Sequence, residues 1–323
     1  MKKIFIAILV LLWLPMLSWG QTGEIGPTKK LGITPFFIYK KFKTQGFLKF
    51  QLKEKHTTLT IRSGAGKLEI VQHDKAEVEV QAEILTNSTS KKKTEKFIRD
   101  FNRLMLIEDD DQLTLRSYFN LDKPKRKSIE GDRYVSGFSM GGALGTPISR
   151  IHLVVKVPPN LLINVRDNSG DILIQNLSND LKIKDGSGKI ELKNLSGKLI
   201  ISDGAGMIVA SQLNDSTQVY DSSGKIVINE VNGYLKVVDT SGNVEIKSVH
   251  ANMYLKDRSG NVILENIDQD LTLKDSSGKI YLKNIGRSKE NKLNLRDRSG
   301  RIVLEKINSQ VELRDSSGKL IRK

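Results

Sequence analysis

The sequence predicts an all-β protein, a single-stranded parallel β-helix (β-solenoid) with 18-residue rungs and one inserted α-helix. A tetrapeptide of the form Asp-x-(Ser/Ala)-Gly occurs nine times between residues 167 and 318. Apolar and polar residues alternate at fixed distances from each copy, which is the period of a strand with one buried face. Identical turns at constant spacing favour a solenoid over the alternative, a globular β-sandwich.

The tetrapeptide is interpreted as a structural turn. Copies start 18 residues apart, except that 22 residues separate Asp275 from Asp297, which indicates an insertion around 287–291. The Asp side chain can accept a hydrogen bond from the backbone N–H two residues on, and Gly supplies the positive φ that a tight corner needs. The turn residues are Asp167, Gly170, Asp185, Gly188, Asp203, Gly206, Asp221, Gly224, Asp239, Gly242, Asp257, Gly260, Asp275, Gly278, Asp297, Gly300, Asp315 and Gly318.

Each repeat is predicted to form two strands joined by two turns. Branched apolar residues lie five and seven positions after each Asp, as at Ile190 and Leu192, and a second alternating pair such as Leu181 and Ile183 precedes the Asp. No single rung can bury its inward face, so the rungs must stack, with each strand pairing with its equivalents above and below. At a spacing of ~4.8 Å, nine rungs give a rod roughly 40 Å long.

Residues 1–20 are expected to be a cleaved secretory signal peptide. Lys2 and Lys3 precede an apolar run that Pro15 ends, and Ser18 and Gly20 provide the small residues of a cleavage site. The run is shorter than the ~20 residues that span a bilayer, which disfavours the alternative of a retained anchor. We therefore expect an extracytoplasmic protein, in the periplasm or at the cell surface of a bacterium.

Residues 21–57 form a basic, aromatic N-terminal segment with two interpretations. Between Lys29 and Lys55 there are eight lysines and one acid, interleaved with aromatic residues. The segment is either an apolar cap that closes the first rung, as solenoids require, or an interfacial patch (29–55) for peripheral contact with an anionic membrane.

Residues 58–157 are predicted to contain the first rungs and an insertion. The stretch 59–70 matches the rung at 199–210, with Ser63 in the place of the turn Asp, and 77–84 and 112–117 have strand alternation. A helix is expected over about 89–105, because Phe97, Ile98, Phe101, Leu104 and Met105 follow helical spacing. Residues from about 122 to 148 are rich in Lys, Arg and Gly and are expected to form a mobile loop. Residues 158–323 complete the regular solenoid.

The charge distribution predicts a polyanion-binding protein. The chain has a formal net charge of +15, but residues 158–323 are nearly balanced, with 25 Lys and Arg against 21 Asp and Glu. Basic residues that precede many of the turn aspartates, such as Arg166 and Lys184, are expected to compensate their charge. Candidate polyanion-binding residues are Lys40, Lys41, Lys43, Lys189, Lys225, Lys279 and Arg301. The expected partner is an anionic glycan, lipopolysaccharide or another envelope polymer.

Several motifs resemble catalytic or metal-binding sites but lack the neighbouring elements that such sites require. Gly137 to Gly141 fits the Gly-x-Ser-x-Gly nucleophile elbow around Ser139, but it lies in a glycine-rich loop without the strand and helix that an elbow needs. A calcium-binding β-roll is a further alternative, although the Gly-Gly-x-Gly-x-Asp turn is missing. There is no cysteine, and the four histidines are scattered. We therefore expect no catalytic residue, no metal site and no cofactor.

The repeated Asp-x-Ser-Gly-x-(Ile/Val)-x-(Ile/Leu) coil behind a signal peptide resembles the bacterial "putative adhesin" family, envelope proteins with a domain of unknown function built as β-helices. The resemblance extends from about Leu59 to Lys323 and implies a right-handed helix outside the cytoplasm.

These observations favour a non-enzymatic exported envelope protein, an adhesin or a polyanion- or glycan-binding solenoid. The alternative is a periplasmic structural or sensing scaffold; a calcium-binding β-roll or a hydrolase using Ser139 ranks lower. Tyr220, Tyr234, Tyr254 and Tyr281 occupy different columns of the repeat, so no sugar-stacking aromatic strip is expected. The edge of the last half-rung, 315–323, is a candidate surface for self-association.

Overall fold

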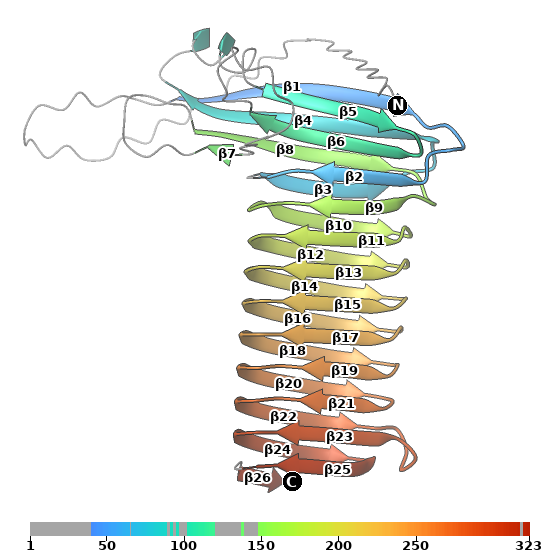
Figure 1. Ribbon diagram of the computed structural model, residues 1–323, viewed down its shortest axis with the longest axis vertical. Coiled ribbons are helices and arrows are strands. Elements are labelled where there is room, and N and C mark those ends of the chain that lie inside the picture. The colour runs from blue at the N-terminus through green and yellow to red at the C-terminus, as the bar shows by residue number, and fades with distance from the viewer. Residues whose placement is uncertain are drawn as a thin grey trace, which may run out of the picture.

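The protein is a parallel β-solenoid of about nine turns with 18-residue spacing, as predicted (Figure 1). The computed structural model describes residues 40–64, 66–88, 91–92, 95–96, 102–119, 137–138, 148–316 and 319–323. Two sheets of 14 and 12 strands face each other along the whole rod.

Each rung contributes one short and one long strand. The short strands belong to the 12-stranded sheet and the long strands to the 14-stranded sheet. In order along the solenoid, the short strands are β9 (Leu162–Arg166), β11 (Leu181–Asp185), β13 (Leu199–Asp203), β15 (Thr217–Asp221), β17 (Leu235–Asp239), β19 (Met253–Lys256), β21 (Leu271–Lys274), β23 (Lys292–Asp297) and β25 (Gln310–Asp315). The long strands are β10 (Asp171–Leu177), β12 (Gly188–Leu195), β14 (Gly206–Leu213), β16 (Gly224–Val231), β18 (Gly242–Val249), β20 (Gly260–Ile267), β22 (Gly278–Ile285), β24 (Gly300–Ile307) and β26 (Lys319–Arg322).

The register places each repeat position directly above its equivalent. Ile190 of β12 pairs with Ile208 of β14, and Leu181 of β11 pairs with Leu199 of β13. The alternating apolar residues are therefore buried between the sheets in continuous columns, and most are less than 4% exposed. This single core stabilises the rod through apolar burial.

The first corner of each rung joins a short strand to the next long strand through the Asp-x-(Ser/Ala)-Gly turn. Glycines from Gly188 to Gly300 at this corner have φ between 135° and 150°, a region that other residues rarely adopt. Asp239 and Asp257 each accept a hydrogen bond from the backbone N–H two residues on, at 3.2 Å. These hydrogen bonds and φ values are those of a tight turn; Gly318 lies outside the described residues.

The second corner contains a feature that the sequence interpretation missed. The residue nine positions after each turn Asp has φ between 53° and 58°, although none is glycine: Asn176, Asn194, Gln212, Glu230, Ser248, Asn266, Asn284 and Lys306. Asn is well suited to this left-handed conformation. Stacked asparagines also bond to each other, with Asn194 Nδ2 donating to Asn176 Oδ1 at 2.7 Å.

Residues 58–72 form the first rung of the solenoid. Its strands β2 (Thr58–Arg62) and β3 (Lys67–Gln72) pair in parallel with β9 and β10, although about ninety residues of chain separate them. Ser63, in the place of the turn Asp, donates a hydrogen bond to Asp167 at 2.8 Å. The described strands of the chain between β3 and β9 therefore lie on the far side of this rung (Figure 1).

The N-terminal end is closed by strands that reverse direction. Beyond β3 in the 14-stranded sheet lie β8 (Ile148–Val157), β4 (Glu77–Ser88) and β1 (Lys40–Gln51), and β4 is antiparallel to both neighbours. Beyond β2 in the 12-stranded sheet lie β6 (Gln112–Phe119) and the antiparallel β5 (Asn102–Asp109). Leu48 and Phe50 of β1 pack against the core, so 40–51 is the edge of a cap in the described part of the predicted 21–57 segment.

The inserted helix over 89–105 is not seen as an element of the described chain. Its last four residues are instead the start of β5, because Leu104 and Leu106 pack against the core from a strand that pairs with β6. Among 89–101 only Lys91, Lys92, Glu95 and Lys96 are described, and these have helical backbone geometry. This part of the prediction is therefore wrong from residue 102 onward.

Two predicted segments fall largely outside the described residues. These are the signal peptide, 1–20, and most of the loop at about 122–148, in which β7 (Gly137–Phe138) pairs with β8. Among the described residues, no helix has the length and apolar character required to cross a membrane.

Substitution of a corner glycine is expected to destabilise the rod. A Cβ on Gly224 would lie 1.9 Å from the carbonyl oxygen of Gly206 in the rung above, and φ is 145°. We expect Gly224→Ala to lower the free energy of unfolding by at least about 2 kcal/mol, measured by urea denaturation of the full chain. Ser222→Ala, in the same turn on an exposed side chain, is the matched control; equal effects of both variants would contradict the proposed backbone strain.

Candidate functional site

The seven predicted polyanion-binding residues do not form one site. Lys189, Lys225, Lys279 and Arg301 lie on the outer face of the 14-stranded sheet, and Lys43 lies in the cap strand β1. Lys189 pairs with Glu191 at 2.6 Å, and Lys225 pairs with Glu245 at 3.5 Å. Only Lys279 and Arg301 are neighbours in register, while the side chains of Lys40 and Lys41 lie outside the described residues.

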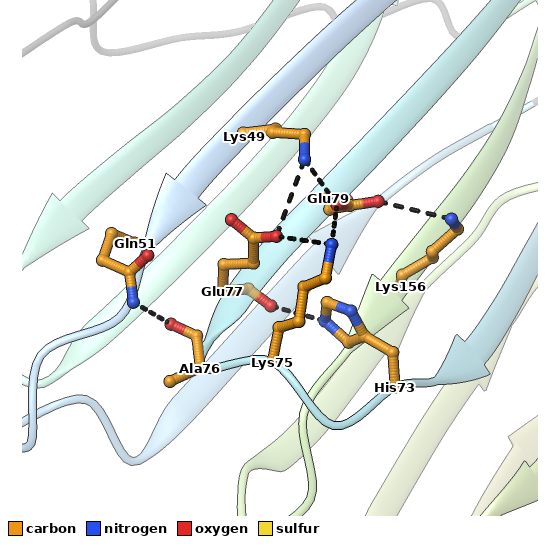
Figure 2. A network of polar contacts seen from close by, with 8 residues as sticks. All are labelled: Lys49, Gln51, His73, Lys75, Ala76, Glu77, Glu79 and Lys156. Atoms are coloured by element: carbon orange, nitrogen blue, oxygen red, sulfur yellow. Dashed lines mark hydrogen bonds and ion pairs between the residues drawn. The ribbon is translucent and has the colours of Figure 1, made fainter.

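The lysines of the cap are engaged by glutamates. Figure 2 shows Lys49, Lys75 and Lys156 around Glu79, at 2.6, 3.7 and 3.3 Å. The hydrogen bond from Lys49, with further hydrogen bonds to Lys156 and Glu77, lowers the pKa of Glu79 to about 2. Lys43 likewise pairs with Glu83 at 2.6 Å. These ion pairs leave little free positive charge on the described part of the predicted 29–55 patch.

A second ionic cluster joins the segment between β1 and β2 to β5. Lys53, Lys55 and His56 contact Glu108 at 2.9, 3.0 and 3.1 Å, and the hydrogen bonds from the two lysines lower the pKa of this carboxyl group to about 2. The cap is thus stabilised as a structural element by charges that cross from strand to strand.

The turn aspartates form a buried ladder along the first corner. The eight from Asp167 to Asp297 are only 1% to 6% exposed, and from Asp185 onward each has at least one carboxylate oxygen without a hydrogen-bond partner. Burial, with a contribution from neighbouring aspartates, raises the pKa of Asp185 and Asp257 to about 7 and of Asp221 and Asp275 to about 6.

The expected compensation of these aspartates by adjacent basic residues is wrong. Successive residues of a strand point to opposite faces, so Lys184 points outward while Asp185 is buried. Among the described residues, no ion pair joins any of these eight aspartates to a cation. The raised pKa values of Asp185 and Asp257 favour the neutral form of these carboxyl groups, which lowers the charge of the ladder at mildly acidic pH.

The same alternation makes the outer face of the 12-stranded sheet strongly basic. We call this surface, from β9 to β23, the basic face. Its outward positions hold eight cations and no acid: Arg166, Lys182, Lys184, Lys236, Lys256, Lys274, Lys292 and Arg296. None of the eight forms an ion pair within the described part of the chain.

The outer face of the 14-stranded sheet has a different electrostatic character. Four of its cations pair with acids, as Lys247 does with Glu245 at 3.1 Å and with Glu265 at 3.9 Å, whereas Lys193, Lys279 and Arg301 form no ion pair among the described residues. The near balance of charge in residues 158–323 therefore conceals a difference between the two outer faces: the 14-stranded sheet carries both cations and acids, and the basic face carries cations without acids.

Three tyrosines lie near one another on the basic face, in different columns of the repeat. Tyr254 (β19) is in register with Lys236 (β17), and Tyr220 (β15) lies one rung before Lys236 in the neighbouring column, where it pairs with Val238. Lys236 Nζ donates to the Tyr220 hydroxyl at 3.1 Å and lies 5.2 Å from its ring centre. Tyr234, just before β17, completes the group; Tyr281 lies on the other sheet.

A shallow hollow of ≈ 440 Å³ lies beside Tyr220. It is lined by Tyr234, Lys236, Val238, Tyr254 and Lys256. Tyr234 is 44% exposed, whereas Tyr254 is half-buried with Lys274 5.5 Å from its ring centre. The residues come from two rungs, so only the stacking brings them together.

The described histidines do not form a metal-binding arrangement, and Ser139 of the candidate nucleophile elbow lies outside the described residues. His152 Nδ1 accepts a hydrogen bond from the backbone N–H of Lys67 at 2.7 Å, and His250 contacts Asp268 on the next rung. In the part of the chain that the structure describes, no three His, Asp or Glu side chains converge as metal ligands would.

The fold defines a class of protein: a two-sheet parallel β-solenoid with a closed N-terminal end and one unpaired basic face. The model of the Toastrack DUF4097 family matches residues 56–320, and the chain belongs to this family. This assignment confirms the resemblance to bacterial adhesin-like domains of unknown function. No curated protein matches the chain.

Similar solved structures share little sequence with this chain. A putative lipid binding protein from Parabacteroides distasonis is 12% identical, with a TM-score of 0.38, over 86% of this chain and 96% of its own. A putative adhesin from Bacteroides fragilis is 10% identical, with a TM-score of 0.31, over 86% and 97%. A putative cell adhesion protein from Clostridium sporogenes is 11% identical, with a TM-score of 0.27, over 87% and 100%.

The buried ladder predicts a stability that falls as pH rises. The pKa of Asp257 is about 7 in the folded state, above its value of ~3.9 in an unfolded chain. The folded protein therefore binds more protons between these values, so its stability is greatest near pH 4 and declines toward pH 8. We expect Asp257→Asn, measured by denaturation midpoints, to be more stable than the wild type at pH 8 by at least about 1 kcal/mol.

The control for this experiment is Glu290→Gln, which removes an exposed carboxylate in the inserted turn. It should leave the pH dependence unchanged. A wild-type stability that is flat between pH 4 and pH 8, or a decline that Asp257→Asn does not reduce, would contradict protonation of the ladder.

Proposed function

We propose that this protein is a non-enzymatic exported envelope protein that binds anionic polymers through its basic face, as an adhesin-like module. The observation that carries the proposal is the set of eight outward cations with no acid among them and no ion pair. A cation with no internal partner can exchange its counterion for a charge on a polymer, which favours binding at low salt.

The shape of the solenoid also supports a polymeric partner. The basic face repeats its positions at every rung, at a spacing of ~4.8 Å, so a linear polyanion lying along the rod meets cations on β9 and β11 and again from β17 to β23. Individual exposed ion pairs are weak, about 0.5 kcal/mol each. Affinity in such a system comes from many simultaneous contacts, which suits attachment to a surface more than turnover of a small substrate.

Substitution of basic-face cations by neutral residues is expected to lower the affinity of the protein for anionic polymers. The triple variant Arg166→Gln, Lys184→Gln and Arg296→Gln removes three fully outward cations. At about 0.5 kcal/mol per contact, binding to immobilised lipopolysaccharide should weaken roughly tenfold. Biolayer interferometry at several salt concentrations measures both the affinity and its salt dependence, which should become less steep in the variant.

The matched control removes three charges from the other sheet: Lys193→Gln, Lys247→Gln and Lys283→Gln. It has the same net charge as the first variant. Equal weakening by both triples would show that net charge alone attracts the polymer, and the basic face would lose its role.

Surface exposure is expected for an adhesin. Protease treatment of intact cells should remove the protein while a periplasmic control survives. Protection until the outer membrane is breached would contradict the adhesin assignment and favour the periplasmic scaffold.

A further inference from the structure

We infer that the tyrosine–lysine hollow on the basic face is a subsite for an acidic sugar residue of an anionic polysaccharide. This inference rests on the proposed function and adds a ligand class and a location to it. We call the group Tyr220, Tyr234, Lys236, Tyr254 and Lys256 the tyrosine subsite. The subsite places rings, hydroxyl groups and ammonium groups from neighbouring rungs side by side.

The subsite combines tyrosine rings with lysine ammonium groups, and the rest of the basic face has no aromatic ring beside its cations. Elsewhere on this face the outward positions offer cations and small polar residues, as at Lys182, Lys184 and Ser202. Here a 44% exposed tyrosine ring, Tyr234, stands beside the hollow formed with Lys236 and Lys256. An aromatic ring packs against the apolar face of a sugar, and an ammonium group pairs with a carboxylate.

Lys236 is held in place at the centre of the subsite. Its Nζ donates to the Tyr220 hydroxyl, which in turn donates to Gln218 Oε1 at 2.8 Å. The hydrogen bond to Tyr220, with further attraction from the Tyr234 and Tyr254 hydroxyl groups, raises the pKa of Lys236. A charged donor whose position is already fixed loses less entropy when it binds an anion.

The geometry favours a sugar over a nucleic acid base. Stacking of successive bases requires several open ring faces, but the half-buried rings of Tyr220 and Tyr254 each have a lysine ammonium group over them, at 5.2 and 5.5 Å. Tyr234 is the most exposed of the three rings, and its hydroxyl group and that of Tyr254 can bond to sugar hydroxyls. One ring, several hydroxyl groups and two cations correspond to a single acidic sugar.

The test measures binding of the full chain to an oligogalacturonate, an acidic oligosaccharide, by isothermal titration calorimetry. Its methyl-esterified form, inorganic polyphosphate and an oligo-dT strand are the comparison probes. We expect the acidic oligosaccharide to bind, and the ester to bind at least about tenfold more weakly because its carboxylates are neutralised.

The variants locate the subsite. Tyr234→Ala should weaken binding of the oligogalacturonate about tenfold and leave binding of polyphosphate unchanged. Lys236→Gln should weaken binding and Lys236→Arg should retain it. Tyr281→Ala, on the other sheet, is the matched control and should have no effect.

The possible failures are distinguishable. Binding of polyphosphate and oligogalacturonate with equal affinity, both insensitive to Tyr234→Ala, would overturn the subsite and leave the polyanion-binding function intact. Tighter binding of oligo-dT that depends on Tyr234 would overturn the sugar in favour of a nucleic acid. Absence of binding to every probe and to lipopolysaccharide would overturn both proposals.

Discussion

The structure depends on one constraint: every residue of a rung lies directly against its own equivalent in the rungs above and below. Stacking at strand spacing pairs Ile190 with Ile208 and Gly206 with Gly224. The constraint excludes a Cβ at the first corner, where it would meet the carbonyl oxygen of the previous rung. It also allows Asn194 to bond to Asn176 at the second corner. A side chain is thus acceptable in this fold only if it can pack against the residues at the equivalent position of the neighbouring rungs.

The buried aspartates show how a solenoid tolerates a residue that should repel its equivalents. Asp185 and Asp257 lie in the corner without a cation, and burial together with the neighbouring carboxyl groups raises the pKa of both to about 7. Each can therefore remain protonated in a mildly acidic medium, so that the ladder carries less charge than its length implies. The Asp carboxyl group still accepts hydrogen bonds from the backbone N–H groups of the turn. Because it is buried, it adds no negative charge to the outer surface.

The two outer faces consequently have different roles. Because the turn aspartates are buried, Lys184, Lys256 and Arg296 on the 12-stranded sheet form no ion pair among the described residues. On the 14-stranded sheet, Lys247 pairs with Glu245. The cap uses its lysines internally, as the contacts of Lys49 and Lys156 with Glu79 show. Among the described residues, cations without neighbouring acids are therefore concentrated on the outer face of the 12-stranded sheet, from β9 to β23.

The sequence alone determined the solenoid, its rung length, the turn and the early rung at 59–70, because these features depend on periodicity within a single repeat. It also held the signal for the basic face, since alternation places Lys184 and Asp185 on opposite sides, but the net charge of the repeat region concealed it. Tertiary structure decided the rest. Residues 102–105 follow a helical spacing, yet pairing with β6 makes them a strand. The contact of Lys236 with Tyr220 joins different columns on successive rungs, and only the stacking register places such residues side by side.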